Sequence, residues 1–278
     1  MNASTLRSQI ALRASMFIVS CALVLTIAAP LARLVPRLMP ALVIGITTAL
    51  FSAAVTLLFV RWDGIGLADV GALPQPGSAP RLVVGFAIGL LLVVLHSSLQ
   101  AAFGHVRWVR APEVDPSTIS VACIAYLALA CREELAFHGY PLRRMAPRFG
   151  LWGAQLLIAT VFAMEHVLGG WTWLNAIAGA GVGSVLFGMG SLATRGLAVP
   201  IGLHAAWNFG DWLRGGKETP GLWMPVVESG FDGPARLVGR VSYVALFLAA
   251  TLAFWVWRRG LSRRAGQPWF GTTGPDVA

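Results

Sequence analysis

Long apolar runs recur along this chain, separated by short segments that contain arginine and turn-forming residues. A helix needs about 20 mostly apolar residues to cross the hydrocarbon core of a bilayer. Backbone groups in lipid must also be hydrogen-bonded within the protein, which an α-helix achieves. We expect spans at residues 15–29, 38–60, 82–103, 118–139, 151–168, 173–194, 197–213 and 237–257. The sequence therefore predicts an all-α, polytopic membrane helix bundle with about eight transmembrane helices.

The charge content argues against a soluble fold. Of the residues, 56% are hydrophobic and 12% are charged, whereas a soluble domain has about 25% charged residues. In water such a chain would expose more apolar surface than soluble proteins tolerate. The net charge of +9 comes mainly from arginines between the apolar runs, as is typical of loops beside anionic lipid. We therefore predict the bilayer as a partner and no nucleic acid.

The first apolar run resembles a secretory signal, but it continues past Cys21 and seven more runs follow. We interpret it as a retained signal anchor. Basic residues are more frequent on the side of the predicted spans that carries both termini, which favours cytoplasmic termini. We expect residues 1–278 to form one integral membrane domain, multi-pass in the plasma membrane. The oligomeric state is not predicted.

Three predicted spans contain ionisable side chains. Glu133 and Glu134 lie in the fourth span, His166 in the fifth and His204 in the seventh, where Asn208 follows. Ionisable groups are costly inside a bilayer unless they pair or line a wet cavity. We therefore expect these three helices to satisfy one another around a single cavity.

Helical spacing adds detail to this site. Residues four apart share a face of a helix, and three pairs have this spacing: Glu134 with His138, Phe162 with His166, and His204 with Asn208. Adjacent Glu133 and Glu134 should point about 100° apart. We expect only one of these two carboxylates to face the cavity.

This set of residues can activate water. A carboxylate in a low-dielectric cavity suits a general base, and an imidazole can position the same water. A second imidazole and a carboxamide can donate to the oxyanion that forms on an attacked carbonyl. Such a site would hydrolyse acyl bonds without a serine or cysteine nucleophile.

Three motifs resemble those of the CPBP (CAAX protease and bacteriocin-processing, Abi) family, which includes the type II CAAX prenyl endopeptidases. Residues 133–139, EELAFHG, resemble its E-E-x-x-x-R motif. Residues 162–166, FAMEH, match F-x-x-x-H, and residues 204–208, HAAWN, match H-x-x-x-N. The resemblance covers about residues 118–211, which we take as the catalytic core.

The resemblance implies a role for each motif residue. Glu133 would be the base that acts on water with His166. His204 and Asn208 would stabilise the oxyanion. Glu134 would have a supporting structural or catalytic role, and Phe162 would support the site beside His166.

One position departs from the family pattern. His138 stands where the motif has arginine. Arginine is always charged and can clamp a carboxylate through two hydrogen bonds, whereas histidine is cationic only part of the time. This difference puts activity in question more than fold. Arg143, Arg144 and Arg148 mainly indicate topology, although one of them could replace the missing arginine.

We therefore predict an intramembrane endopeptidase whose substrate is a membrane-associated peptide or protein, processed in CAAX-type or bacteriocin- and immunity-related reactions. Two histidines and two carboxylates can also ligate zinc, but we favour a site without cofactor or metal. A serine protease that pairs Ser184 with His204 is a weaker reading. The main alternative is a non-catalytic membrane protein on the same fold, either a transporter or a pseudo-enzyme that binds a partner or confers immunity.

Overall fold

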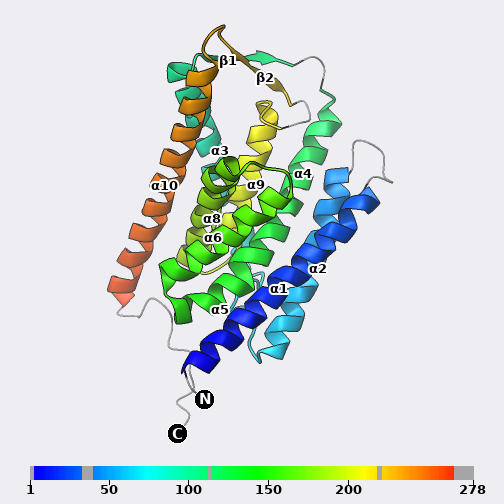
Figure 1. Ribbon diagram of the computed structural model, residues 1–278, viewed down its shortest axis with the longest axis vertical. Coiled ribbons are helices and arrows are strands. Elements are labelled where there is room, and N and C mark those ends of the chain that lie inside the picture. Colours follow the sequence, from blue (N-terminus) through cyan, green and yellow to red (C-terminus); the bar gives the residue numbers. More distant parts are fainter. Residues whose placement is uncertain (1–2, 33–39, 112–113, 218–220, 266–278) are drawn as a thin grey trace.

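Long helices run back and forth between the two ends of the molecule in the computed structural model (Figure 1). The structure describes residues 3–32, 40–111, 114–217 and 221–265. In chain order the elements are α1 (Ala3–Ala32), α2 (Pro40–Trp62), α3 (Ser78–Phe103), β1 (Val106–Arg110), α4 (Pro116–Glu133), the π-helix η1 (Glu134–Gly139), α5 (Tyr140–Phe149), α6 (Leu151–Leu168), α7 (Trp173–Asn175), the π-helix η2 (Ala176–Gly181), α8 (Val182–Thr194), α9 (Ala198–Leu213), β2 (Trp223–Val227) and α10 (Asp232–Ala265).

The predicted all-α membrane bundle is confirmed, and each predicted span has a helical counterpart. Residues 38–39, at the start of the second predicted span, lie outside the described part. Six helical segments in the described residues are long and apolar enough to cross a membrane: 7–24, 41–62, 78–103, 151–168, 173–194 and 232–261. The remaining two counterparts, α4 with η1 and α9, carry the first and third motifs and do not meet these criteria.

The helix of the fourth predicted span also continues beyond residue 139. The helical elements α4, η1 and α5 follow one another directly as far as Phe149, and the helix is interrupted at Gly139, whose ψ of −108° is not helical. Arg143, Arg144 and Arg148 are therefore helical residues beyond the motif.

Helix α9 lies inside the bundle, where it packs against α3, α4 and α8. Figure 1 shows α1 and α2 on one side of this centre and α10 on the other. Two glycines allow α3 and α9 to pack closely. A Cβ atom on Gly85 would overlap the carbonyl oxygen of Val199, and one on Gly202 would overlap the carbonyl oxygen of Leu82. Small residues at such crossings are typical of membrane helices.

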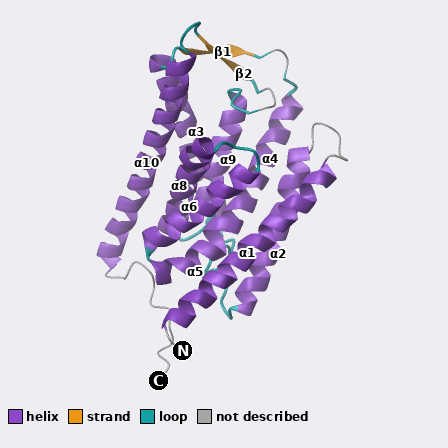
Figure 2. Cartoon of the chain, in the orientation of Figure 1, coloured by secondary structure: helices purple, strands orange, loops and turns teal. Residues whose placement is uncertain are grey.

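At one end of the bundle, two segments that the sequence predicts as loops form a small antiparallel ribbon (Figure 2). Strand β1 pairs with β2, and Val106 lies opposite Val227. The two strands are more than 100 residues apart in the sequence. Hydropathy does not predict such a ribbon, because each strand is completed by a partner that is distant in the chain.

At the other end, where α1 begins and α10 ends in Figure 1, a buried carboxylate joins three elements. The side chain of Asp63 is only 2% exposed. It pairs with Arg13 of α1 and with Arg144 of α5, whose Nε lies 2.8 Å away. The Tyr140 hydroxyl donates to the same carboxylate at 2.8 Å. Asp63 therefore ties the N-terminal helix to the segment that follows the first motif.

We expect Asp63→Asn to lower the stability of the folded protein by about 2 kcal/mol. The substitution removes the buried negative charge and leaves the two arginines without their carboxylate partner. The unfolding temperature in detergent measures this change. Asp69→Asn is the matched control, since Asp69 is exposed in the same loop and accepts from the Gly66 backbone. Equal unfolding temperatures for the two variants would contradict this role of Asp63.

We expect Gly202→Ala to separate α3 from α9, because the new methyl group meets backbone rather than a movable side chain. The variant should unfold at a lower temperature and yield less folded protein. Gly260→Ala on α10 is the control, since a Cβ atom there meets nothing within 4 Å. A Gly202→Ala variant as stable as this control would show that the close approach is not required.

Candidate active site

The first motif lies in a π-helix. All six residues of η1 are buried. Such wide turns are rare and often occur at functional sites. The Ser191 hydroxyl donates to the backbone carbonyl of His138 at 3.1 Å, so a neighbouring helix satisfies a carbonyl within this irregular turn. The motif is thus held from outside as well as by its own backbone.

Glu134 lies at the centre of the site and is completely buried. Its Oε2 is 2.8 Å from Nδ1 of His138, and its Oε1 is 2.9 Å from Nδ1 of His204. An ionised carboxylate only accepts hydrogen bonds, so both imidazoles donate their Nδ1–H groups to it. Glu134 therefore fixes the orientation of two histidines and has both oxygens occupied.

Glu133 has a different environment. Its Oε1 accepts from Arg132 at 2.8 Å, and its Oε2 lies 3.4 Å from Nε2 of His204. The expectation that only one of the two glutamates faces the site was wrong. Both reach His204 because its ring lies between them with one nitrogen toward each, and because the helix widens at Glu134.

Aromatic rings surround these groups. The His204 ring stacks on Phe187 with centroids 4.1 Å apart and an interplanar angle of 12°. The buried Phe162 ring lies 4.7 Å from the His166 ring, 6.3 Å from His138 and 6.4 Å from His204. Phe162 thus contacts the imidazoles of all three motif-bearing segments, and it keeps the site at low dielectric.

His166 lies at the edge of this cluster. Its Nδ1 is 2.9 Å from the carbonyl oxygen of Phe162. Because a carbonyl only accepts, Nδ1 carries the proton, and Nε2 of the neutral ring keeps its lone pair. This tautomer can accept a hydrogen bond from a water molecule.

Asn208 lies one turn after His204, as its spacing predicts. Its Oδ1 accepts from Nζ of Lys217 at 3.2 Å, and Lys217 is also 3.3 Å from Asp211. The carbonyl end of the amide is therefore occupied, which leaves the NH₂ group as the end of Asn208 that can donate elsewhere.

His138, at the position of the motif arginine, is fully buried, and its Nε2 lies 3.0 Å from the Ser184 hydroxyl. The serine reading paired Ser184 with His204, but the structure places Ser184 against His138. The packing here is tight: a Cβ atom on Gly188 would lie 3.0 Å from the His138 ring and would overlap the side chain of Gln155.

Sequence reasoning missed two residues of the site. Arg132 is buried and donates to Glu133 and, through its other terminal nitrogen, to Glu165 of α6. Glu165 neighbours His166 in the sequence, so regular helix geometry points the two side chains about 100° apart. An arginine inside an apolar span next to two glutamates was the available signal, because a buried cation needs carboxylate partners.

These contacts form one continuous chain of polar side chains across the bundle. It passes through α8, η1, α9, α4 and α6 in the order Ser184, His138, Glu134, His204, Glu133, Arg132 and Glu165. Every member except the two ends therefore has two partners. The network compensates the charges that the bilayer would otherwise disfavour.

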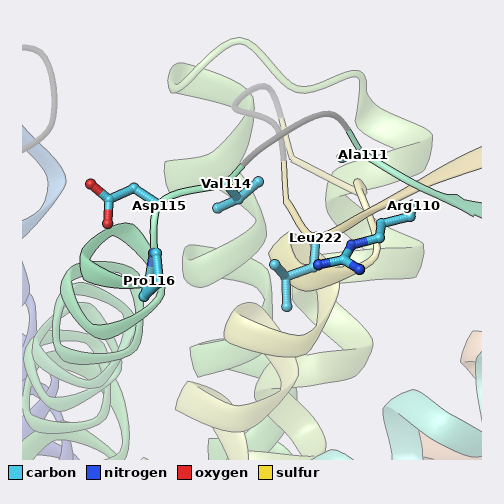
Figure 3. Close-up of a pocket in the computed structure, with 6 residues that line it drawn as sticks. All are labelled: Arg110, Ala111, Val114, Asp115, Pro116 and Leu222. Atoms are coloured by element: carbon cyan, nitrogen blue, oxygen red, sulfur yellow. The ribbon is translucent and has the colours of Figure 1, made fainter.

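Two cavities lie away from this network of polar side chains. One, of about 530 Å³, is at the ribbon end; Figure 3 shows its lining, which includes Arg110, Asp115 and Leu222 but no motif residue. The other, of about 370 Å³, is mainly apolar and lies at the opposite end. Its walls include Cys131 and Leu135, which flank the glutamate pair on the same helix.

Among the described residues, no group of three or more His, Cys, Asp or Glu side chains is arranged to hold a metal ion. The two ring nitrogens of His138 instead contact a carboxylate and a hydroxyl. The cofactor prediction stays a prediction, which a chelator can test.

Comparison with known proteins agrees with the motifs. Residues 115–210 match the family model Rce1-like, described as type II CAAX prenyl endopeptidase Rce1-like. This segment is similar to the CAAX protease family. The match runs from the residue that caps α4 into the last turn of α9 and contains all three motifs. The predicted family resemblance is confirmed, and the chain is a multi-pass membrane protein related to proteases. No curated protein matches the chain.

Proposed function

We propose that this protein is an intramembrane endopeptidase of the glutamate type, in which Glu133 and His166 activate water. One observation carries the assignment of roles. Both oxygens of Glu134 accept from histidines, whereas Glu133 keeps Oε2 beside His204 at a longer distance of 3.4 Å. Glu134 therefore orients the two histidines, and Glu133 can take a proton.

In the proposed reaction, water is the nucleophile. Glu133 removes a proton from water while Nε2 of His166 accepts a hydrogen bond from the same water. The water oxygen attacks the peptide carbonyl carbon and a tetrahedral oxyanion forms. The C–N bond then breaks, and Glu133 returns the proton to the leaving amine, so the products are a carboxylic acid and an amine.

His204 and Asn208 would stabilise the oxyanion. His204 already donates Nδ1–H to Glu134, and its Nε2 lies 3.4 Å from Glu133, so an N–H on Nε2 would be the donor to the oxyanion. That N–H and the Asn208 NH₂ group would be the two donors to the developing negative charge. Glu134 and His138 act as the orienting groups behind His204.

The substrate is a membrane-associated protein or peptide. The apolar cavity beside Cys131 and Leu135 suits an apolar part of the substrate, and a prenylated C-terminal segment of the CAAX type has such a group. The bacteriocin- and immunity-related substrates predicted from the sequence remain a second class. We propose that the termini face the cytoplasm of a plasma-membrane protein, since basic residues favour that orientation.

We expect Glu133→Gln to lower the rate of hydrolysis about 100-fold or more, because general-base catalysis contributes 10²–10⁴-fold. An internally quenched peptide that ends in a farnesylated cysteine and three further residues is the first probe. Peptides released from native membranes, measured by mass spectrometry, form a second assay that assumes no lipid on the substrate.

Glu228→Gln is the control for this variant, since the Glu228 side chain is 65% exposed in the turn after β2. Activity should also survive a chelator. Loss of activity on chelation and its return with zinc would contradict the metal-independent mechanism. Products that are identical for wild type and Glu133→Gln in both assays would show that the chain is a non-catalytic protein on this fold.

A serine mechanism is the second candidate, because Ser184, His138 and Glu134 follow one another as nucleophile, base and orienting acid do. All three side chains are buried, and Ser184 is only 1% exposed. A substrate therefore has no access to this serine in the structure. We expect Ser184→Ala to change the rate less than about 10-fold, since it removes one hydrogen bond of about 1 kcal/mol. A fall to the level of Glu133→Gln in the same assay would instead favour the serine mechanism.

A further inference from the structure

Arg132 is a buried cation between two carboxylates that come from different helices. Its side chain is 5% exposed, while those of Glu133 and Glu165 are 15% and 18% exposed. One terminal nitrogen donates to Oε1 of Glu133 at 2.8 Å, and the other donates to Oε1 of Glu165. The planar guanidinium suits this bridge, because its two terminal nitrogens point in fixed, diverging directions.

The bridge formed by Arg132 is relevant to the one motif position, residue 138, at which this sequence departs from the family pattern. The residue at the motif arginine position, His138, contacts Glu134 and Ser184, so both of its ring nitrogens have partners other than Glu133. Of the three arginines considered as replacements, two have other partners, and the third, Arg148, is exposed near the end of α5. Arg143 donates to Ser191, and Arg144 pairs with Asp63.

We propose that Arg132 is the positioning residue that replaces the missing motif arginine, by clamping Glu133 to Glu165 so that only Oε2 of Glu133 faces His204. This inference rests on the proposed function, since it assigns Arg132 to the base of that reaction. It also gives Glu165 a role as the anchor that holds Arg132 from α6.

The geometry explains why such a clamp is needed. Without a cation, Glu133 and Glu165 would be two carboxylates facing one buried position, where their like charges repel each other. Other charged or titratable groups around Glu133 are His204 on α9, Glu134 on η1 and His166 beside Glu165; Cys21 on α1 lies near Arg132. Arg132 is the permanent cation in this set.

The test compares Arg132→Gln, Arg132→Lys and Arg132→Gln/Glu165→Gln with wild type on the farnesylated peptide and in the membrane-peptide assay. Arg132 touches Glu133 rather than substrate, so we expect Arg132→Gln to lower kcat at least 10-fold with KM unchanged within about 3-fold. Lysine should restore part of kcat because it keeps the charge. Removing Glu165 in the Arg132→Gln background should also restore part, because it removes the competing carboxylate.

Arg148→Gln is the matched control, since Arg148 is exposed near the end of α5. An inactive Glu133→Gln together with a fully active Arg132→Gln would overturn this inference and leave the proposed function standing. Full activity of both variants would overturn the two together.

Unfolding temperatures in detergent provide a readout that does not depend on catalysis. If Arg132 bridges the two carboxylates, Arg132→Gln/Glu165→Gln unfolds at a higher temperature than Arg132→Gln alone. Strictly additive losses for the two substitutions would overturn the clamp even if Arg132→Gln lowers activity.

Discussion

Glu134 is the group on which the site depends. A carboxylate with no exposed surface must have a donor on each oxygen, and here two histidines from different helices supply them. That requirement fixes the distance between η1 and α9 and the orientation of both imidazoles. The π-helix serves the same requirement, since it places His138 against Glu134 while the Ser191 hydroxyl satisfies the carbonyl of His138.

The close packing of the apolar helices makes the contact between His204 and Glu134 possible. His204 reaches Glu134 because α9 lies deep in the bundle, and α9 lies there because Gly85 and Gly202 let α3 approach it backbone to backbone. A glycine at residue 188 has the corresponding effect on α8, where it leaves room for the His138 ring. Small residues that hydropathy treats as neutral therefore set the position of charged ones.

The sequence predicts the helices well because apolar length is a local property, and it predicts which three helices carry the site because buried charge is conspicuous in apolar spans. It does not predict the π-helix, which changes how Glu133 and Glu134 share His204. The β1–β2 ribbon and the Arg132–Glu165 bridge also escape it, since both depend on segments far apart in the chain. Local pattern identifies the residues of this site, and long-range packing decides their partners.

The charges in the network of side chains from Ser184 to Glu165 are relevant to how the proposed site would react without a metal ion. In the proposed reaction Glu133 takes a proton and loses its charge as an oxyanion gains one, so the net charge of the buried region stays the same. His204 has Nε2 at 3.4 Å from Glu133 and Nδ1 held by Glu134. In the proposed reaction it would transfer its Nε2–H hydrogen bond from the carboxylate to the oxyanion. A site whose donors are already oriented avoids reorganisation during the reaction, and this preorganisation is the main source of electrostatic stabilisation in enzymes.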